Sequence, residues 1–569
     1  MGSRLMKNWL ILPLLDLDEI HSRQNTVEYL ITDTSLKEQV VRDIKQVGDL
    51  ERLISKVALR RINPKELLLL SSALKSIKSI KKNCAAVECR PIEKFASSLF
   101  LCEDLVEIID RHIAEDAPVL VNKGGVFKSG INEELDEYLS ISKNSKDYLL
   151  NLKNQEAEKT GISSLKLAFN NVFGYYLEVT HTHKDKVPEE WIRKQTLVSA
   201  ERYITPELKE FEEKILAADD KISVIEQKLY VELVERLSTY ISQVQSNARN
   251  IAKLDCLCSF ATVSSENNFS KPEVNDELSI AIKDGRHPVI EQQLPLGEEY
   301  IPNDIYLNTD EQQIVILTGP NMSGKSAVLR QTALTVLLAQ VGCFIPARHA
   351  QIGLTDKIYT RVGASDNISQ GESTFMVEMV ETASILNNLS DRSLVILDEI
   401  GRGTSTFDGV SLAWSIAEYL NQNKHRPKTL FATHYHELNE LESKCEGIVN
   451  YYITTEESRN KVIFLRKMKK GGSEHSFGIH VARMAGIPKK VLKRADTILK
   501  QLETDRAHIS TKNTFKKIPN DMYQLNLFQI DDPKTAEIVE TIHKLNIDSL
   551  TPIEALMKLN EIKQILEDN

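Results

Sequence analysis

One loop in the middle of the chain restricts its fold more than any other feature. It reads Gly319-Pro320-Asn321-Met322-Ser323-Gly324-Lys325-Ser326. The apolar run Ile314-Val315-Ile316-Leu317 precedes it, and an apolar, helix-like segment follows from Ala327 to Val341. A glycine-bounded loop between a buried strand and a helix offers backbone N–H groups at the positive end of the helix dipole, where phosphates bind. Because Lys325 can reach the β- and γ-phosphates and the Ser326 hydroxyl can bind Mg²⁺, the loop predicts a nucleoside triphosphate site.

A second segment indicates that the nucleotide is hydrolysed. The run Leu394-Val395-Ile396-Leu397 is apolar throughout, which is typical of a parallel strand covered on both faces, and Asp398 and Glu399 follow it. An acidic pair in this place is also typical of a solvated strand end. With a phosphate loop upstream, however, we expect Asp398 to hold Mg²⁺ through water and Glu399 to orient or deprotonate the attacking water.

Two further segments carry candidate γ-phosphate contacts. A buried strand is expected at Thr429-Leu430-Phe431-Ala432-Thr433, and His434 at its carboxyl end would sense the γ-phosphate. Upstream of Asp398, a Ser/Gly-rich turn that contains Ser373 leads into a helix. Such a helix N-terminus suits the γ-phosphate of a nucleotide bound by another subunit.

Four segments in order, TGPNMSGKS, STFMVEM, DEIGRGTSTFDG and ATHYHEL, resemble the ATPase domain of the MutS family of DNA mismatch repair proteins. That domain is an ABC-type ATPase whose copies pair head to tail. The resemblance therefore implies ATP and Mg²⁺ as cofactors, a homodimer through the ATPase domains, and contact of Ser373 with the partner's nucleotide. It also implies double-stranded DNA and a MutL-like repair factor as partners. The resemblance extends over the whole chain.

Length and composition agree with this organisation. The chain has 569 residues, which is enough for three or four domains, and 41% of them are hydrophobic. No run of eighteen apolar residues occurs, so we expect no membrane span. The resemblance to DNA repair proteins implies a cytoplasmic, nucleoid-associated location. The seven cysteines lack zinc-site spacing and are expected to be reduced thiols. The net charge of −10 argues only mildly against DNA binding, because only the surface that touches DNA needs to be basic.

The expected fold class is multidomain: an α-helical lever or core domain with an inserted small β-rich clamp domain, then an α/β ABC-type P-loop ATPase domain and C-terminal helices. Apolar residues spaced three and four apart predict helices before the clamp, and Thr205-Pro206 predicts the start of a long helix that runs from about Leu208 to Asn250. The expected boundaries are lever 1–152, clamp 153–204, returning lever 205–265, ATPase domain with dimerisation helices 266–504, linker 505–530 and oligomerisation tail 531–569.

The expected clamp has a different texture from the helices around it. Residues 165–180 predict two strands around an Asn/Gly turn, and basic residues follow. By resemblance to the MutS clamp, the DNA backbone would be contacted by Lys166, Asn170, Arg193 and Lys194. A solvated loop is the competing interpretation. Contacts of this kind would give affinity without sequence reading.

Tyr300 is the candidate for the adenine ring. It lies in Tyr300-Ile301-Pro302-Asn303-Asp304, a segment that also matches the family, where the aromatic residue stacks on adenine. Stacking contributes on the order of 1–3 kcal/mol with little base selectivity. A buried structural tyrosine is the alternative.

Relatives carry two more domains before the lever, of which the first reads mismatches with the Phe of a Phe-x-Glu motif. In this sequence Met1 lies within the helical scaffold, and Phe-x-Glu occurs as Phe211-Glu212-Glu213 on the expected long helix, where the Phe is an ordinary apolar residue. We therefore expect these 569 residues to contain the lever, clamp and ATPase but not the mismatch-binding and connector domains.

The C-terminal segment offers two more predictions. A sliding-clamp-binding motif is expected in the linker, at Gln524, Leu525, Leu527 and Phe528, although a local hydrophobic anchor would look the same. Beyond it, an amphipathic stripe follows a capping box at Thr551-Pro552-Ile553-Glu554. Such a stripe suits self-association, for example into a tetramer.

The sequence thus predicts an ATP-dependent DNA-binding clamp of mismatch repair that closes and slides on duplex DNA. One alternative is a paralogue that acts on recombination or branched DNA intermediates. Another, of a different class, is a non-hydrolysing scaffold whose nucleotide locks a dimer on DNA. The acidic pair Asp398-Glu399 and His434 argue against the scaffold.

Overall fold

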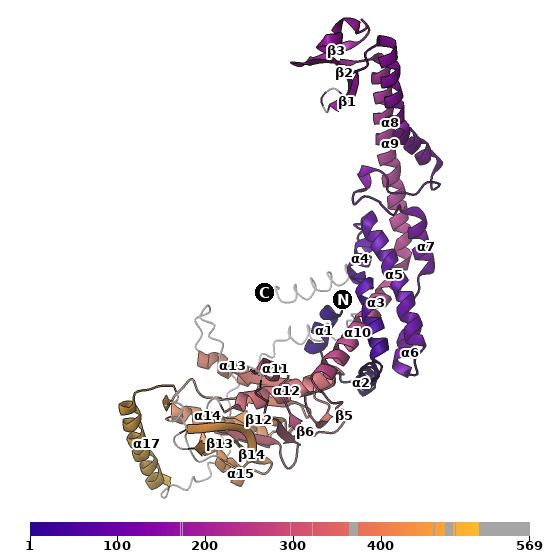
Figure 1. The fold of residues 1–569 in the computed structure, drawn as a ribbon. Coiled ribbons are helices and arrows are strands. Elements are labelled where there is room, and N and C mark those ends of the chain that lie inside the picture. Colours follow the sequence, from indigo (N-terminus) through magenta and orange to yellow (C-terminus); the bar gives the residue numbers. More distant parts are fainter. Residues whose placement is uncertain are drawn as a thin grey trace, which may run out of the picture. The chain divides into compact units, whose positions relative to one another are not determined.

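The computed structural model divides the chain into two compact units, 1–486 and 487–569 (Figure 1). It describes residues 1–510 except for 171, 173, 296, 321–322, 364–373, 459–460, 473–478, 480–481 and 484. For residues 142–147, 214–216, 456–458, 461–464, 500 and 502–510 it describes the backbone alone. The helix described in the second unit is α17 (Lys489–Ser510). Among all these residues, no helix combines the length and the apolar character that a membrane span needs.

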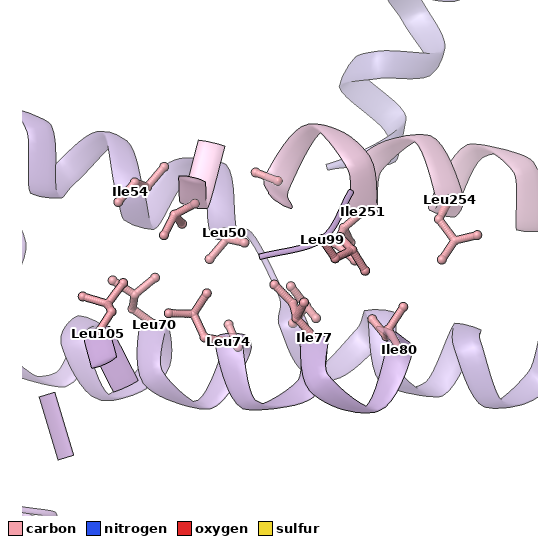
Figure 2. Packing of buried hydrophobic residues seen from close by; sticks show 14 of the residues in the cluster. Leu50, Ile54, Leu70, Leu74, Ile77, Ile80, Leu99, Leu105, Ile251 and Leu254 are labelled. Carbon is pink, nitrogen blue, oxygen red and sulfur yellow. The ribbon is translucent and has the colours of Figure 1, made fainter. Parts of the chain in front are cut away.

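The N-terminal part is helical, as its apolar spacing predicts. Its elements are α1 (Gly2–Ile11), α2 (Leu17–Thr32), α3 (Thr34–Val47), α4 (Leu50–Ala58), α5 (Pro64–Ala85), α6 (Arg90–Ser97), α7 (Glu103–His112), η1 (Val121–Lys123) and α8 (Glu133–Thr160). Figure 2 shows side chains of α5, among them Leu74 and Ile77, that point towards Leu50 of α4 and Ile251 of α10 (Ile241–Glu266). Each such buried side chain contributes about 1.5–3 kcal/mol relative to an exposed one.

Helix α9 (Pro206–Leu237) begins as predicted, because the Thr205 hydroxyl accepts a hydrogen bond from Leu208 N at 3.0 Å. The long helix that we expected up to Asn250 is interrupted. A 3₁₀ turn, η3 (Ser238–Tyr240), separates α9 from α10. The hydroxyl of Ser238 donates to the carbonyl of Glu235, and such local bonds compete with the regular helical pattern.

A small antiparallel sheet lies between α8 and α9 in the sequence. Its strands follow the order β1 (Lys166–Asn170), β2 (Gly174–Thr180), β4 (Ala200–Ile204) and β3 (Ile192–Thr196), with η2 (His181–Lys186) between β2 and β3. The pairing of β1 with β2 confirms the hairpin predicted around the Asn/Gly turn. Helices α8 and α9 run side by side next to this sheet (Figure 1). The ring of Tyr148 on α8 stacks on that of Phe211 on α9, with centroids 3.8 Å apart.

The largest described sheet follows the order β10 (Ile358–Val362), β11 (Leu394–Asp398), β12 (Lys428–Ala432), β8 (Ile314–Thr318), β13 (Ile448–Ser458) and β14 (Lys461–Lys470). The strands β10, β11, β12, β8 and β13 are parallel, and β14 is antiparallel to β13. Alternate residues of β8 enter two different hydrophobic cores, with Val315 and Leu317 on one face and Ile314 and Ile316 on the other. Continuously apolar strands are required for this arrangement, because both faces are covered.

Helices cover both faces of the parallel sheet. On one face lies α12 (Lys325–Gln340), and on the other lie α13 (Thr374–Asn387) and α14 (Thr406–Gln422). Shorter elements are α11 (Ile290–Gln293), η5 (His436–Glu440) and α15 (Leu441–Lys444). A second sheet beside α12 follows the order β5 (Glu273–Asn275), β9 (His349–Gly353), β6 (Ile280–Gly285) and β7 (Asn303–Leu307).

The end of α12 is bonded directly to the N-terminal helices. The side chain of Gln340 donates to the carbonyl of Leu14 at 2.9 Å, and the guanidinium of Arg23 on α2 donates to the carbonyl of Val341 at 3.1 Å. Arg23 also lies over the ring of Trp9, 3.5 Å from its centroid. The helix that starts at the phosphate loop therefore ends on the helical part of the chain.

Candidate active site

The register of the parallel strands brings three predicted site segments to one edge of the sheet. Asp398 at the end of β11 pairs with Ala432 of β12, and Ala432 pairs with Leu317 of β8. The phosphate loop starts two residues after Leu317, and His434 follows two residues after Ala432. Ligands of open α/β sheets bind at this carboxyl edge. The arrangement follows from the sequence, since each segment comes directly after an apolar run.

The loop between β8 and α12 has the backbone of a phosphate cradle. Gly319 and Gly324 have φ of 146° and 104°, in the left-handed region that side chains disfavour, and α12 begins at Lys325 directly after Gly324. The first N–H groups of α12 therefore face the loop. Ser323 is buried, and its hydroxyl has no hydrogen-bond partner among the residues that the structure describes. An unpaired buried hydroxyl in a glycine-bounded loop fits a phosphate oxygen.

Lys325 is almost fully buried, with 4% of its surface exposed. Its ammonium group donates to the carbonyls of Gly319 and Pro320 and lies 3.7 Å from Glu399 Oε1. Burial lowers the pKa of this lysine, and the carboxylates of Glu399 and Asp398 oppose the shift. A buried cation that is held by loop carbonyls and nearby carboxylates is well placed to bind a phosphate, which offers it a stronger anionic partner.

The two candidate magnesium ligands are next to each other. The Ser326 hydroxyl hydrogen-bonds to Asp398, and burial raises the pKa of that carboxyl more than the hydrogen bond lowers it. The second oxygen of Asp398, Oδ1, is buried without a partner in the described part of the chain. A hydroxyl, one carboxylate and substrate phosphates form the all-oxygen set that Mg²⁺ prefers, so these residues fit the ion. In the part of the chain that the structure describes, no group of three or more His, Cys, Asp or Glu side chains could hold a metal ion.

Glu399 has a strained backbone. Its φ is 55°, which is uncommon for a residue other than glycine, and its N–H donates to the carbonyl of Ala432 at 2.9 Å. One carboxylate oxygen accepts from Arg402 Nη1 at 2.8 Å, and the other faces Lys325. The carboxylate of Glu399 is therefore directed into the phosphate site, where the prediction requires it.

His434 and Tyr300 approach the site from other elements. His434 keeps an exposed surface, yet desolvation by the surrounding protein lowers the pKa of its imidazole, with an opposing effect of Glu399. The hydroxyl of Tyr300 donates to Gln331 Oε1 of α12 at 3.0 Å, and burial raises the pKa of this tyrosine to about 12. Tyr300 is thus attached to the phosphate-loop helix and only partly buried, which leaves both of its interpretations open.

Residues that the sequence reasoning did not single out complete this edge. Glu378 of α13 is buried and accepts a hydrogen bond from Gly401 N at 2.6 Å, and Tyr435 donates to Gly401 O at 2.9 Å. Arg361 of β10 is buried beside Glu378. The available signal was the position of Glu378 and Tyr435 inside STFMVEM and ATHYHEL, but the motifs do not show that both contact the backbone of one residue.

The four predicted DNA contacts are not brought together. Lys166 and Asn170 lie on β1, whereas Arg193 and Lys194 lie on β3, the opposite outer strand of the small sheet. The register pairs Lys166 with Glu178 and Arg193 with Tyr203. Through the intervening strands, Lys166 and Arg193 therefore face opposite sides of the sheet.

The basic side chains of this sheet also differ in their partners. Arg193 is 3.5 Å from Glu201 Oε1 and Lys184 is 3.2 Å from the same atom, while Glu201 is only 2% exposed. Lys166 and Lys194 are exposed. The charge of Arg193 is thus partly neutralised by a buried carboxylate, which weakens its case as a phosphate contact relative to the two lysines.

Other predicted site residues lie outside the described residues. These are Asn321, Met322 and Ser373 of the nucleotide site and Gln524, Leu525, Leu527 and Phe528 of the sliding-clamp motif. Their assignments stay predictions.

Comparison with known proteins agrees with the geometry. A family model described as MutS domain III matches residues 1–261, and one described as MutS domain V matches residues 315–503. The chain is 56% identical over 570 residues to the DNA mismatch repair protein MutS of Bacteroides thetaiotaomicron, covering 100% of this chain and 66% of that protein.

Proteins of the same description are 55% identical in Christiangramia forsetii and in Cytophaga hutchinsonii, again over 100% of this chain and over 65% and 66% of theirs. The chain thus spans about two thirds of the length of these relatives. The phosphate loop, the acidic pair and His434 lie inside the region that matches domain V. With two domain models and a similarity that runs from end to end, the chain belongs to the MutS family of DNA mismatch repair proteins.

Proposed function

We propose that the chain hydrolyses ATP and uses the reaction to change its grip on duplex DNA during mismatch repair. The observation that supports hydrolysis best is the convergence of Lys325, Ser326, Asp398 and Glu399 at one edge of a parallel sheet. Binding alone would need only the loop and its lysine. A second carboxylate directed at the phosphate site is what hydrolysis adds.

Each residue has a separate task in this proposal. The loop N–H groups and Lys325 bind the β- and γ-phosphates of ATP, and Tyr300 stacks on adenine. Ser326 and Asp398 would hold Mg²⁺, which neutralises charge that develops on the phosphate oxygens. Glu399 orients the attacking water and accepts its proton, and His434 contacts the γ-phosphate. Because the pKa of His434 is lowered, its imidazole is mostly neutral at pH 7 and can donate one hydrogen bond while it accepts another.

The proposed assembly is a homodimer through the ATPase domains, with Ser373 of each subunit at the partner's nucleotide. Residues 1–152 and 205–265 form the lever, 153–204 the clamp and 266–504 the ATPase domain. The bonds from Gln340 and Arg23 support coupling between ATPase and lever, because they join the phosphate-loop helix to the helical part. A MutL-like factor, the sliding clamp and tetramer formation through the tail belong to the same proposal, as does a cytoplasmic, nucleoid-associated location.

Mismatch repair is favoured over a role on recombination intermediates. The relatives quoted above are named DNA mismatch repair proteins, and the similarity is 55–56% over the whole of this chain rather than confined to the ATPase motifs.

A binding experiment tests the DNA half of the proposal. We expect the polypeptide of these 569 residues to bind matched and G·T-mismatched linear duplexes within about threefold of each other, because phosphate contacts do not report on base pairing. The aromatic residue of the Phe-x-Glu segment, Phe211, stacks on Tyr148 within the chain, so we do not expect it to read mismatches. Affinity should decrease steeply with salt as counterions are released.

Competition binding at two salt concentrations measures both effects, and Leu69→Ala, an exposed position on α5, serves as a neutral control. A mismatch preference of about tenfold or more would show that a reading element exists in these residues, because that ratio corresponds to about 1.4 kcal/mol of discrimination. Salt-independent binding would contradict the phosphate contacts.

A further inference from the structure

The backbone of Gly401, two residues after Glu399, is held on both of its sides by side chains from other elements. Its N–H donates to Glu378 Oε1 of α13 at 2.6 Å, and its carbonyl accepts from the hydroxyl of Tyr435 at 2.9 Å. Glu378 is 6% exposed and Tyr435 is 5% exposed. Neither bond is part of the regular hydrogen bonding of a helix or a strand. Two buried polar side chains are instead used to satisfy the backbone of this loop.

Glu378 is a buried charge with a cation beside it. Arg361 Nη2 of β10 lies 3.8 Å from Glu378 Oε2, and Arg361 Nε lies 3.2 Å from Oε2 of the exposed Glu381. A hydrogen bond from a backbone N–H to a carboxylate is about twice as strong as one between neutral groups. The bond from Gly401 N to Glu378 is therefore the stronger of the two that hold the backbone of Gly401.

The loop after β11 packs closely against α14 and has an unusual backbone conformation. Gly401 has φ of 87°, and a Cβ atom at this position would lie 2.7 Å from the carbonyl oxygen of Gly409 in α14. Glu399 is itself in the left-handed region, with φ of 55°. A backbone strained in this way costs about 1–3 kcal/mol and persists only where its surroundings determine it.

We propose that Glu378 is a positioning residue for ATP hydrolysis. By fixing the Gly401 N–H, Glu378 keeps the loop in the conformation that directs the Glu399 carboxylate towards Lys325 and the attacking water. Tyr435, adjacent to His434, fixes the next peptide group by its bond to the Gly401 carbonyl. This inference rests on the proposed hydrolysis at Glu399 and adds to it a residue that contacts neither nucleotide nor metal.

Three substitutions separate positioning from a merely structural role. Glu378→Ala removes the acceptor of the Gly401 N–H, whereas Glu378→Gln keeps an acceptor oxygen in the same place. Glu381→Ala disturbs the same Arg361 from an exposed position, 53% of its side chain being accessible, and does not touch Gly401. ATP binding at equilibrium, kcat, KM and the thermal unfolding midpoint are measured for each variant of the whole chain.

We expect Glu378→Ala to lower kcat on the order of 10²-fold, because a misplacement of about 1 Å has effects of this size, while ATP affinity changes less than about threefold. Glu378→Gln should recover at least about tenfold of that loss, and Glu381→Ala should keep kcat within about threefold of wild type. A purely structural role would instead lower the unfolding midpoint and leave the kcat of the folded protein unchanged. Glu378→Gln would then show no higher kcat than Glu378→Ala.

Tyr435→Phe keeps the experiment decisive if Glu378→Ala does not fold, since it removes the second hold on Gly401 without leaving a buried charge. We expect it to lower kcat about tenfold at unchanged ATP affinity, the loss of one positioning hydrogen bond. Wild-type kcat in Tyr435→Phe, together with wild-type kcat in Glu378→Ala where that variant folds, would overturn the inference alone. A wild-type chain that hydrolyses no ATP would overturn the proposed function and this inference with it.

Discussion

Replacing Glu399 with alanine is expected to leave ATP binding intact and to slow hydrolysis by about 10²–10⁴-fold, the range that a general base contributes. Glu399 Oε1 lies 3.7 Å from Lys325 Nζ, and Oε2 accepts a hydrogen bond from Arg402. Among the loop residues that the structure describes, no backbone N–H donates to this carboxylate. The substitution therefore removes the group that orients water and leaves the binding contacts in place.

Binding of a fluorescent ATP analogue and single-turnover hydrolysis measure the two properties separately. Glu399→Gln is a second test, because its amide keeps the size of the side chain but accepts a proton poorly. Glu442→Ala, at an exposed position on α15, is the control and should behave as wild type. Near-normal turnover in both Glu399 variants would remove this residue from the mechanism.

We expect Lys325→Ala and Ser373→Ala each to abolish most hydrolysis alone but to complement each other when mixed. Removal of one charge-stabilising donor costs about 10²–10³-fold in rate. Each site would use Lys325 of one subunit and Ser373 of the other. In a mixed dimer one site then carries both substitutions and the second site carries neither. Random pairing of equal amounts in a symmetric dimer restores about a quarter of the wild-type sites.

The matched control joins both substitutions in one chain and mixes it with wild type. Every site of that mixed dimer carries one defect, so only the wild-type homodimers, again about a quarter of all dimers, stay active. In the mixture of the two single variants, recovery of activity should depend on exchange of subunits. It should be absent when the two variants are mixed without time to exchange. Mixtures of the single variants that stay as inactive as either parent would contradict the assignment of Ser373 to the partner's site, which rests on the family resemblance because Ser373 lies outside the described residues.

The parts of the site that could be predicted are those in which chemistry follows directly after a strand. Asp398, Glu399 and His434 each follow an apolar run, and parallel strands in register bring their ends together. The cap at Thr205 and the hairpin of β1 and β2 were predictable for a similar reason, since a few neighbouring residues determine them. Local patterns of this kind leave a direct trace in the sequence.

What could not be predicted depends on contacts between distant residues. Nothing in the spacing of Glu378, Gly401 and Tyr435 shows that the backbone of Gly401 bonds to both side chains. The ion pair between Arg193 and the buried Glu201 could not be predicted either, because it follows from the order of strands in the small sheet. The break at Ser238 was missed because apolar periodicity continues through it, while the hydroxyl-to-carbonyl bonds that accompany the break carry no periodic signal.

Phosphate release by the wild-type chain, measured in parallel with ATP binding and with duplex DNA present or absent, tests the central claim most directly. The convergence of Lys325, Ser326, Asp398 and Glu399 predicts that ATP binds, that phosphate is released over many turnovers and that DNA changes the rate. Stable ATP binding without phosphate release, under conditions where the Glu399→Ala variant behaves identically, would contradict it and identify the chain as a scaffold that nucleotide merely locks on DNA.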